Sequence, residues 1–440
     1  MTLPAKFVER VLRDLGGTEG AALCAALDAE PPVSVRLNPA KTGADTLPAG
    51  PDAGLPVPEA AGLPALAIAG RVPWSRDGRY LAVRPSFTLD PDFHAGAYYV
   101  QEASSQFVGH LLAAVRTEGA RILDLCAAPG GKTTLYASLA GPDGLVVANE
   151  IDRRRASVLA DNVRKWGTGN VAVTTCEPRA LGDFEAWFDV VAVDAPCSGE
   201  GMFRKDPDAR GEWSEGNVKQ CAARQDEILR EAWRALRPGG TLVYSTCTFN
   251  RDEDEGALER MAAWAGDEIA ESEETAVEDA WGIVCGRVGA FRTFRFYPHR
   301  TCGEGFFAAV ARKSFDAGGR VRAPKARRTV FAAVDRKTAG ELARWVRNPG
   351  GMHFAAVADT CYAWYAAQAD AVRTLSEALP VIYSGVALGQ VFKGVLKPDP
   401  ALAFFDGMNR GALPAAELDD EETLRFLRRQ DIAAGGLAEG

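Results

Sequence analysis

Two cysteines each follow an apolar run that is typical of a buried strand. Cys197 lies in the string DAPCSGEG at 194–201, directly after the apolar residues 190–193, and Cys247 ends the string TLVYSTC at 241–247. A lone cysteine at the end of a strand is usually a small buried apolar residue. Two of them at one edge of a sheet, with Asp194 three residues before the first, favour a nucleophilic site.

Such a pair suits chemistry on a cytosine ring. Carbon 5 of cytosine is a poor nucleophile, but a thiolate that adds to carbon 6 enables carbon 5 to attack an electrophilic methyl group. A carboxyl group such as Asp194 at ring nitrogen 3 would stabilise the adduct. A base must then remove the proton on carbon 5, and a second thiol can assist release. The alternative for Asp194 is a magnesium ligand of the kind that nucleotide triphosphatases place after an apolar strand.

A glycine-rich loop lies upstream, in the string ILDLCAAPGGKTT at 122–134. Glycines let backbone amides approach a ligand closely, and a helix that starts there favours anionic groups. One interpretation is a phosphate-binding loop, but Cys126 stands where the first glycine of that motif belongs. The other is the cofactor loop of a methyltransferase-type Rossmann fold. Glu150, about 20 residues further on, favours the second, because an acid there binds ribose hydroxyls.

Between 101 and about 313 the pattern alternates between strands and helices. The predicted strands are Arg121–Cys126, Leu145–Glu150, Val171–Cys176, Val190–Asp194, Thr241–Cys247, Thr293–Tyr297 and Gly305–Ala311. The predicted helices are Thr133–Ala140, Arg153–Trp166 and Val218–Leu236, the last of them stopped by the PGG string at 238–240. This alternation predicts a doubly wound parallel sheet, whose ligands lie beyond the carboxyl ends of the strands.

Several strings taken together resemble the Sun-type (NOP/Sun) RNA cytosine-5 methyltransferases. They are YYVQEASS at 98–105, CAAPGGKT at 126–133, DAPCSGEG at 194–201, LRPGGTLVYSTCT at 236–248, and RFYPH at 295–299 with GEGFF at 303–307. The likeness covers nearly the whole chain and is strongest over 84–311. Within the family it is greatest to the bacterial RsmF/YebU group, which modifies small-subunit rRNA. It implies a Rossmann-like, class I S-adenosylmethionine-dependent methyltransferase domain of α/β class.

The resemblance also implies roles for individual residues. Cys247 matches the family's nucleophile, Cys197 matches the cysteine that aids product release, and Asp194 matches the acid that contacts the cytosine ring near the methyl donor. The cofactor site that it implies consists of Cys126, Ala127, Ala128, Pro129, Gly130, Gly131, Lys132, Glu150, Glu177 and Asp194. Glu177 departs from the family's usual Asp-Gly-Arg string, since EPR occupies 177–179.

The flanking segments differ in texture from this domain, which we place at 91–313. The segment 1–90, with the string PVSVRLNP at 32–39, is similar to the family's small α+β, RNA-binding-like N-terminal domain, and its residues 41–70 are rich in Gly, Pro and Ala, as in a linker. A basic linker over 314–328 leads to 329–440, which reads as a separate α+β module. There the string YSGVALGQVFK at 383–393 resembles the group's PUA-like RNA-binding domain.

The net charge at first argues against a nucleic-acid binder. Lys and Arg number 50 and Asp and Glu 59, so the formal charge is 50 − 59 = −9. Residues 251–280 hold twelve acids and two arginines, whereas 311–328 hold seven basic residues and one acid. We therefore expect the acidic stretch to face solvent away from RNA and the basic segments to meet it.

Other features narrow the class. No apolar run approaches the roughly 18–20 residues of a membrane helix, and the nine cysteines include no C-x-x-C pair that would indicate zinc. We expect a cytoplasmic, metal-independent monomer that binds S-adenosylmethionine. Its expected reaction is methylation of carbon 5 of cytosine in small-subunit (16S) rRNA, within a 30S subunit or an assembly intermediate. A tRNA substrate, or a P-loop nucleotide triphosphatase, are the alternatives.

Overall fold

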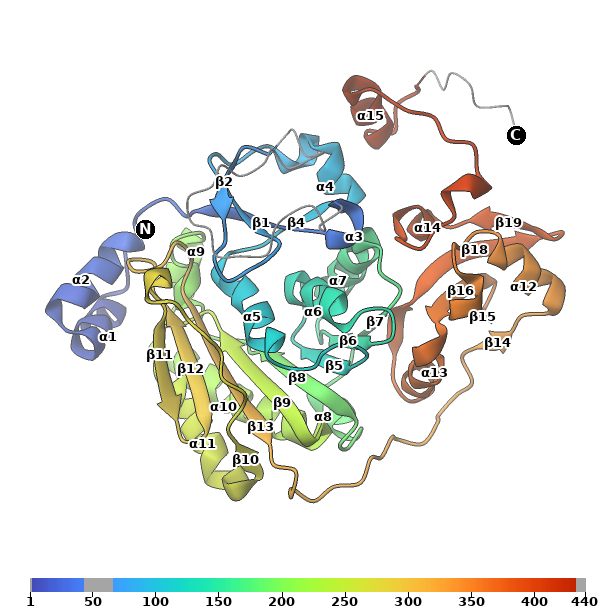
Figure 1. Cartoon of the computed structure of the whole chain (residues 1–440). Coiled ribbons are helices and arrows are strands. Elements are labelled where there is room, and N and C mark those ends of the chain that lie inside the picture. Colours follow the sequence, from blue (N-terminus) through green and yellow to red (C-terminus); the bar gives the residue numbers. More distant parts are fainter. Residues whose placement is uncertain (1, 43–65, 433–440) are drawn as a thin grey trace.

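The centre of the molecule is one mixed β-sheet (Figure 1). The computed structural model describes residues 2–42 and 66–432. Within them the sheet has ten strands, in the order β11-β12-β13-β9-β8-β5-β6-β7-β17, with β10 (Ile269–Ala270) paired to β13 off this path. Its parallel strands are β5 (Arg121–Leu125), β6 (Leu145–Asn149), β7 (Val171–Thr174), β8 (Phe188–Asp194) and β9 (Leu236–Thr246).

These parallel strands lie in the Rossmann order. Numbered along the chain, β5 to β9 lie in the order 3-2-1-4-5 across the sheet. The order reverses between β5 and β8, and ligands of such sheets bind beyond the carboxyl ends of the strands at that point. Next to β9 the sheet continues with antiparallel strands, which are β13 (Phe306–Lys313), β12 (Phe291–Phe296) and β11 (Val284–Val288). The doubly wound parallel sheet that the sequence predicts is confirmed.

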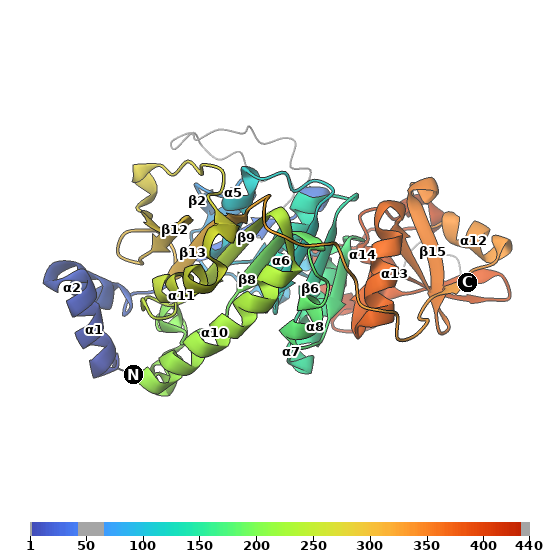
Figure 2. The same cartoon turned by 90° about the horizontal axis from the view of Figure 1, so that it is seen from below.

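Helices cover both faces of the sheet (Figures 1 and 2). One face packs against α5 (Phe107–Ala113), α6 (Gly131–Ala140) and α7 (Arg153–Trp166), and the other against α8 (Pro178–Gly182), α10 (Glu215–Ala235) and α11 (Glu255–Ala265). Along β5, Ile122 lies in the hydrophobic cluster on the face of α5, α6 and α7. Leu123 and Leu125 lie in the cluster on the face of α8, α10 and α11. Strands buried on both faces read as continuous apolar runs, which is why the sequence pattern marks them so clearly.

The N-terminal segment forms a helical pair and a small sheet. The helices α1 (Ala5–Leu15) and α2 (Gly17–Ala26) pack through Phe7 and Leu23 in one cluster with Phe203, Trp213 and Phe249 of the central domain. A four-stranded antiparallel sheet follows, in the order β2 (Ile68–Arg71), β3 (Gly78–Leu81), β1 (Val33–Leu37) and β4 (Tyr98–Val100). Short helices α3 (Pro39–Thr42) and α4 (Pro91–Ala95) flank it. Most of the expected linker, 43–65, lies outside the described residues.

The C-terminal segment has its own sheet, which consists of β14 (Ala332–Ala333), β15 (Met352–Val357), β16 (Thr360–Tyr365), β18 (Val386–Phe392) and β19 (Val395–Pro398). Its helices are α12 (Arg336–Ala343), α13 (Ala369–Ala378), α14 (Pro400–Phe404) and α15 (Asp420–Leu427). The strand β17 (Val381–Ser384), however, pairs antiparallel with β7 and so extends the central sheet. The segment therefore differs from the separate module that its texture suggests, because its strand β17 forms an edge of the central sheet.

One predicted boundary is wrong. The PGG string at 238–240 does not stop the helix α10, which ends at Ala235. The backbone becomes extended at Leu236, which pairs with Phe188, and β9 runs through the PGG string with a shift in register. Pairing with β8 therefore outweighs the turn propensity of Pro and Gly. Among the residues that the structure describes, no helix is long and apolar enough to span a membrane.

Candidate active site

The carboxyl ends of β8 and β9 bring the two predicted cysteines together. These strands are parallel neighbours, with Asp194 opposite Ser245. The Sγ atoms of Cys197 and Cys247 lie 3.3 Å apart. The hydrogen bond with Cys247, together with burial, raises the pKa of the Cys197 thiol, so Cys197 is held in its protonated form. One thiol of the pair is thereby kept as a proton donor beside the other.

Asp194 joins this pair to the glycine-rich loop. Its Oδ2 lies 2.9 Å from Nζ of Lys132, and its Oδ1 accepts a hydrogen bond from the Ser245 hydroxyl at 2.8 Å. Burial lowers the pKa of Lys132, but the neighbouring charges of Asp194 and Asp124 outweigh it, and the net effect raises that pKa. The ammonium group is therefore held in its charged form between the glycine-rich loop and the end of β8.

A cavity of about 170 Å³ lies between the glycine-rich loop and the strand β4. Of the predicted site it is lined by Cys126, Ala127, Ala128, Pro129, Gly131, Lys132 and Asp194. Asp124 lines it as well; its Oδ2 accepts from Thr133, while Oδ1 is buried with no hydrogen-bond partner among the described residues. Burial raises the pKa of Asp124 to about 7. An acceptor without a donor, in a cavity bordered by further carboxylates, fits a cationic ligand.

The loop around this cavity has an unusual backbone. Cys126 has a φ of 61° and Gly130 a φ of 111°, both in the region that favours glycine. A Cβ at Gly130 would lie 2.9 Å from a methyl carbon of Leu159 on α7, so a side chain there would have to displace Leu159 as well as adopt a strained φ. Burial raises the pKa of the Cys126 thiol to about 12. The half-buried Cys126 thiol is therefore held in its neutral form.

The three remaining predicted cofactor residues lie outside the lining of the cavity. Gly130 is the N-cap of α6 and belongs to the glycine-rich loop, but it does not line the cavity. Glu150 follows β6 and is 2% exposed; its Oε1 accepts the Asp152 amide at 3.0 Å, and its Oε2 lies 3.3 Å from Arg155. Glu177 is exposed at the N-cap of α8. Their ligand roles remain predictions.

The structure adds residues before the glycine-rich loop that sequence reasoning did not assign to the cofactor site. Gln101 and Glu102, in the YYVQEASS string, line the cavity together with Tyr99. The buried Arg36 donates to Oε1 of Gln101 at 2.7 Å and to the hydroxyl of Thr134 on α6 at 2.6 Å. An arginine inside the apolar string VSVRL was the available signal, since a buried cation needs partners. The small sheet thus holds the start of α6 and the cofactor loop.

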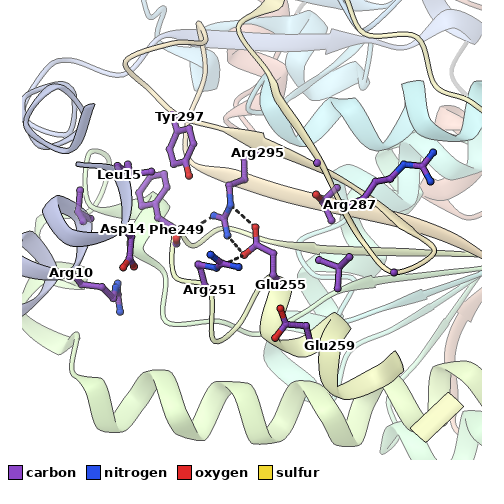
Figure 3. Close-up of a pocket in the computed structure, with 15 residues that line it drawn as sticks. Arg10, Asp14, Leu15, Phe249, Arg251, Glu255, Glu259, Arg287, Arg295 and Tyr297 are labelled. Atoms are coloured by element: carbon purple, nitrogen blue, oxygen red, sulfur yellow. Dashed lines mark hydrogen bonds and ion pairs between the residues drawn. The ribbon is translucent and has the colours of Figure 1, made fainter. Parts of the chain in front are cut away.

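A larger cavity of about 540 Å³ lies between α1, the residues after Cys247 and the β11–β12 hairpin (Figure 3). Its dominant feature is Arg295, which makes two bonds to the carboxylate of Glu255, at 3.0 and 2.6 Å, and a third to the carbonyl of Phe249 at 3.1 Å. It also lies 2.9 Å from Asp254, whose other oxygen accepts from Thr246 at 2.6 Å. Arg295 therefore clamps the residues that follow Cys247, because it contacts both the Phe249 carbonyl and the carboxylates of Asp254 and Glu255.

Two acids depart from the expectation that the stretch 251–280 faces solvent. Glu253 and Asp254 are fully buried. Other acids of the stretch are paired with arginines, for example Glu271 with Arg287 at 2.5 Å. The physical reason is that the stretch starts immediately after the Cys247 loop and supplies its supporting carboxylates. Nine of the twelve acids of the stretch are nevertheless exposed, so most of its negative charge faces solvent, as expected.

Strand order, the ligand crevice at the switch point and the solved neighbours together define a Rossmann-like methyltransferase fold. A methyltransferase homologue from Pyrococcus horikoshii is 26% identical, with a TM-score of 0.57, over 70% of this chain and 94% of that chain. The structure described as NSun6 from Pyrococcus horikoshii with SFG is 21% identical, with a TM-score of 0.56, over 70% and 98%. This second likeness concerns the fold alone.

Comparison with family models gives a more specific result than the comparison of folds. Residues 111–312 match the family model 16S rRNA methyltransferase RsmB/F, and residues 3–103 match the N-terminal domain of 16S rRNA methyltransferase RsmF. The chain therefore carries an RsmB/F-type methyltransferase domain preceded by an RsmF-type N-terminal domain. Ribosomal RNA small subunit methyltransferase F of Enterobacter sp. is 37% identical over 249 residues, which are 55% of this chain and 51% of that protein. The chain spans about half the length of the curated relatives it matches.

Proposed function

We propose that this protein is an S-adenosylmethionine-dependent RNA methyltransferase that methylates carbon 5 of cytosine in small-subunit (16S) rRNA. The observation that carries the proposal is the pair of thiols at Cys197 and Cys247, 3.3 Å apart. Asp194, three residues before Cys197, also borders the cavity of the glycine-rich loop. The proposed nucleophile, the proposed acid and the candidate cofactor cavity therefore lie beyond the carboxyl ends of the neighbouring strands β5, β8 and β9.

In the proposed reaction the Cys247 thiolate forms a bond to carbon 6 of the cytosine, and the electrons of the 5,6 double bond make carbon 5 nucleophilic. Asp194 is assigned the hydrogen bond to the ring nitrogen, which would stabilise the adduct. Carbon 5 would take the methyl group, and the electrons of the broken methyl–sulfur bond would stay with the donor. A base then removes the proton on carbon 5, and the electrons of that carbon–hydrogen bond re-form the 5,6 double bond as the bond between sulfur and carbon 6 breaks and returns the thiolate. Cys197, held in its protonated form beside Cys247, assists this release.

The cofactor assignment is supported by the charge of the cavity. S-adenosylmethionine supplies an electrophilic methyl group on a cationic sulfonium. The buried, unpartnered oxygen of Asp124 and the carboxylates of Glu102 and Asp194 offer acceptors to such a cation. Residues 126–132 would hold the ligand through their backbone, with Lys132 compensating one carboxylate. Glu150 and Glu177 are proposed to meet the nucleoside end, following the family pattern.

The substrate and setting follow from the relatives. The curated relatives are named for ribosomal RNA of the small subunit, so we propose that rRNA, in a 30S subunit or an assembly intermediate, is the substrate in the cytoplasm. We propose RNA contacts by the segment 1–90 and, as a PUA-like domain, by 329–440, joined to 91–313 through the basic linker 314–328. We further propose a monomer that needs no metal.

Methyl transfer from labelled S-adenosylmethionine to 16S rRNA, naked and in 30S subunits, tests the proposal. Mapping the product should place the label on carbon 5 of cytosine. Cys247→Ala should abolish transfer, and full activity in that variant would refute the assigned nucleophile. Labelling of tRNA in place of rRNA would support the first alternative. Calorimetric binding of Mg-ATP without binding of S-adenosylmethionine would support a nucleotide triphosphatase.

A further inference from the structure

A buried polar network lies directly behind the two thiols. Its centre is Asn250, three residues after Cys247 and fully buried. The Nδ2 of Asn250 lies 2.8 Å from the hydroxyl of Thr248 and 3.1 Å from that of Ser198, and these two hydroxyls are 3.0 Å apart. Thr248 follows Cys247 and Ser198 follows Cys197, so one amide group contacts both cysteine loops.

The buried carboxylate of Glu253 completes the bridge. Its Oε1 accepts from Nδ2 of Asn250 at 2.6 Å, and its backbone amide donates to Oδ1 of Asn250 at 2.9 Å. Its Oε2 accepts the amide of Ser198 and the side chain of Gln225, both at 2.9 Å. Gln225, on α10, also donates to the carbonyl of Pro196 at 3.0 Å. The backbone next to Cys197 is thus tied to the loop of Cys247 through Glu253.

The chemistry of this position requires an amide. Nδ2 of Asn250 faces the carboxylates of Glu253 and Glu200 in addition to the two hydroxyls. An aspartate there would place a third carboxylate among buried acceptors, and an alanine would leave several of them without their donor. Burial already raises the pKa of Glu253. The network is therefore built around a donor that only asparagine supplies at this length.

We propose that Asn250 is a positioning residue, which sets the spacing of Cys197 and Cys247 by bridging the two loops that carry them. The inference rests on the proposed function, because it assumes that these two thiols perform the chemistry. Asn250 touches neither sulfur, so it acts through Thr248, Ser198 and Glu253. Its loss should disturb the chemical step and leave cofactor binding, which uses the loop at 126–132, in place.

The test uses the full-length protein with Asn250→Ala. We expect kcat for methyl transfer to fall about 100-fold, as for a misplacement of about 1 Å in a reacting group. KM for RNA and the calorimetric Kd for S-adenosylmethionine should stay within about threefold of the wild type. The pH profile of Cys247 alkylation by iodoacetamide, followed by mass spectrometry, should also shift, because the partner thiol has moved. If Asn250 contributed only to stability, the folded fraction of Asn250→Ala would keep the wild-type kcat and the wild-type pH profile of Cys247 alkylation.

Asn170→Ala is the matched control. Asn170 is also a buried asparagine, 3% exposed, and its Nδ2 donates to the carbonyls of Ala137 and Gly141 at 2.9 and 2.7 Å, away from the thiols. This control should lose comparable stability and keep kcat and the alkylation profile. Should Asn250→Ala fail to fold, Ser198→Ala removes one hydroxyl of the same bridge with little loss of volume. We expect that variant to lower kcat about tenfold.

Wild-type kcat and an unshifted alkylation profile in folded Asn250→Ala, or in Ser198→Ala if the first does not fold, would overturn the positioning role. Cys247→Ala is assayed in parallel. If that variant retains activity, the proposed function has failed and not the bridge. If it is inactive while the bridge variants are fully active, the proposed function stands and the bridge has failed.

Discussion

The ammonium group of Lys132 lies 2.9 Å from the carboxylate of Asp194. This ion pair joins the first turn of α6 to the carboxyl end of β8, across the point where the strand order reverses. The Lys132 side chain is 14% exposed and that of Asp194 33%. The pair is therefore screened only in part by water, and it couples the proposed cofactor site to the proposed catalytic acid.

Lys132→Met should lower methyl transfer by about 100-fold, because Asp194 loses the cation that fixes its orientation and charge. Transfer to 16S rRNA at saturating S-adenosylmethionine measures this, with circular dichroism to verify folding. Lys219→Met, an exposed position on α10, serves as the control and should keep full activity. Unchanged transfer in a folded Lys132→Met would show that the ion pair is not used in catalysis.

Cys197→Ala should trap the reaction after methyl transfer. The variant keeps the proposed nucleophile Cys247 but lacks the neighbouring thiol proposed to assist release, so a covalent protein–RNA adduct should accumulate. A shifted band on a denaturing gel, sensitive to ribonuclease, detects it. The double variant Cys197→Ala with Cys247→Ala should show no adduct, and Cys285→Ala, at an exposed cysteine, should behave as wild type. An adduct in the double variant would assign the nucleophile elsewhere.

Asp124 makes stability depend on pH. Because burial raises its pKa from an ordinary 3.8 to about 7, the folded state holds a proton that the unfolded state releases earlier. Its contribution to stability is full below about pH 4 and is lost as pH rises through about 7, by up to about 4 kcal/mol. Urea unfolding at several pH values should show a flatter dependence for Asp124→Asn than for wild type. If the unfolding free energies of both proteins depended on pH in the same way, Asp124 would not be the source of the pH dependence.

Arg10 of α1 should stabilise the docking of the N-terminal helices. It forms an ion pair with Glu200, whose side chain is fully buried and also accepts from the indole of Trp213 at 2.9 Å. Arg10→Ala should cost about 2 kcal/mol of unfolding free energy, since it leaves a buried carboxylate without its cation. Arg13→Ala, whose side chain is 71% exposed, should cost less than about 0.5 kcal/mol. If both variants lost the same unfolding free energy, the ion pair between Arg10 and Glu200 would not explain the effect.

Local patterns in the sequence were enough to predict much of the methyltransferase domain. Strands buried on both faces read as apolar runs, and α7 (Arg153–Trp166) has the predicted bounds, because Asp152 caps its start and Gly167 ends it. The predicted reaction and the family resemblance both came from the glycine-rich loop and the strings around Cys197 and Cys247. The PGG string misled the prediction, since pairing of Leu236 with Phe188 depends on a distant strand.

The sequence by itself determined the order of the strands and helices and which residue types lie at the strand ends. Tertiary structure alone decided that the two sulfur atoms meet at 3.3 Å, that Arg36 supports the cofactor loop and that β17 closes an edge of the sheet. It also turned part of an acidic stretch into buried supports, Glu253 and Asp254, behind the thiols. The reason is physical: periodicity and turn chemistry act between near neighbours in the chain, whereas the partners of buried charges lie on distant strands that only the fold brings together.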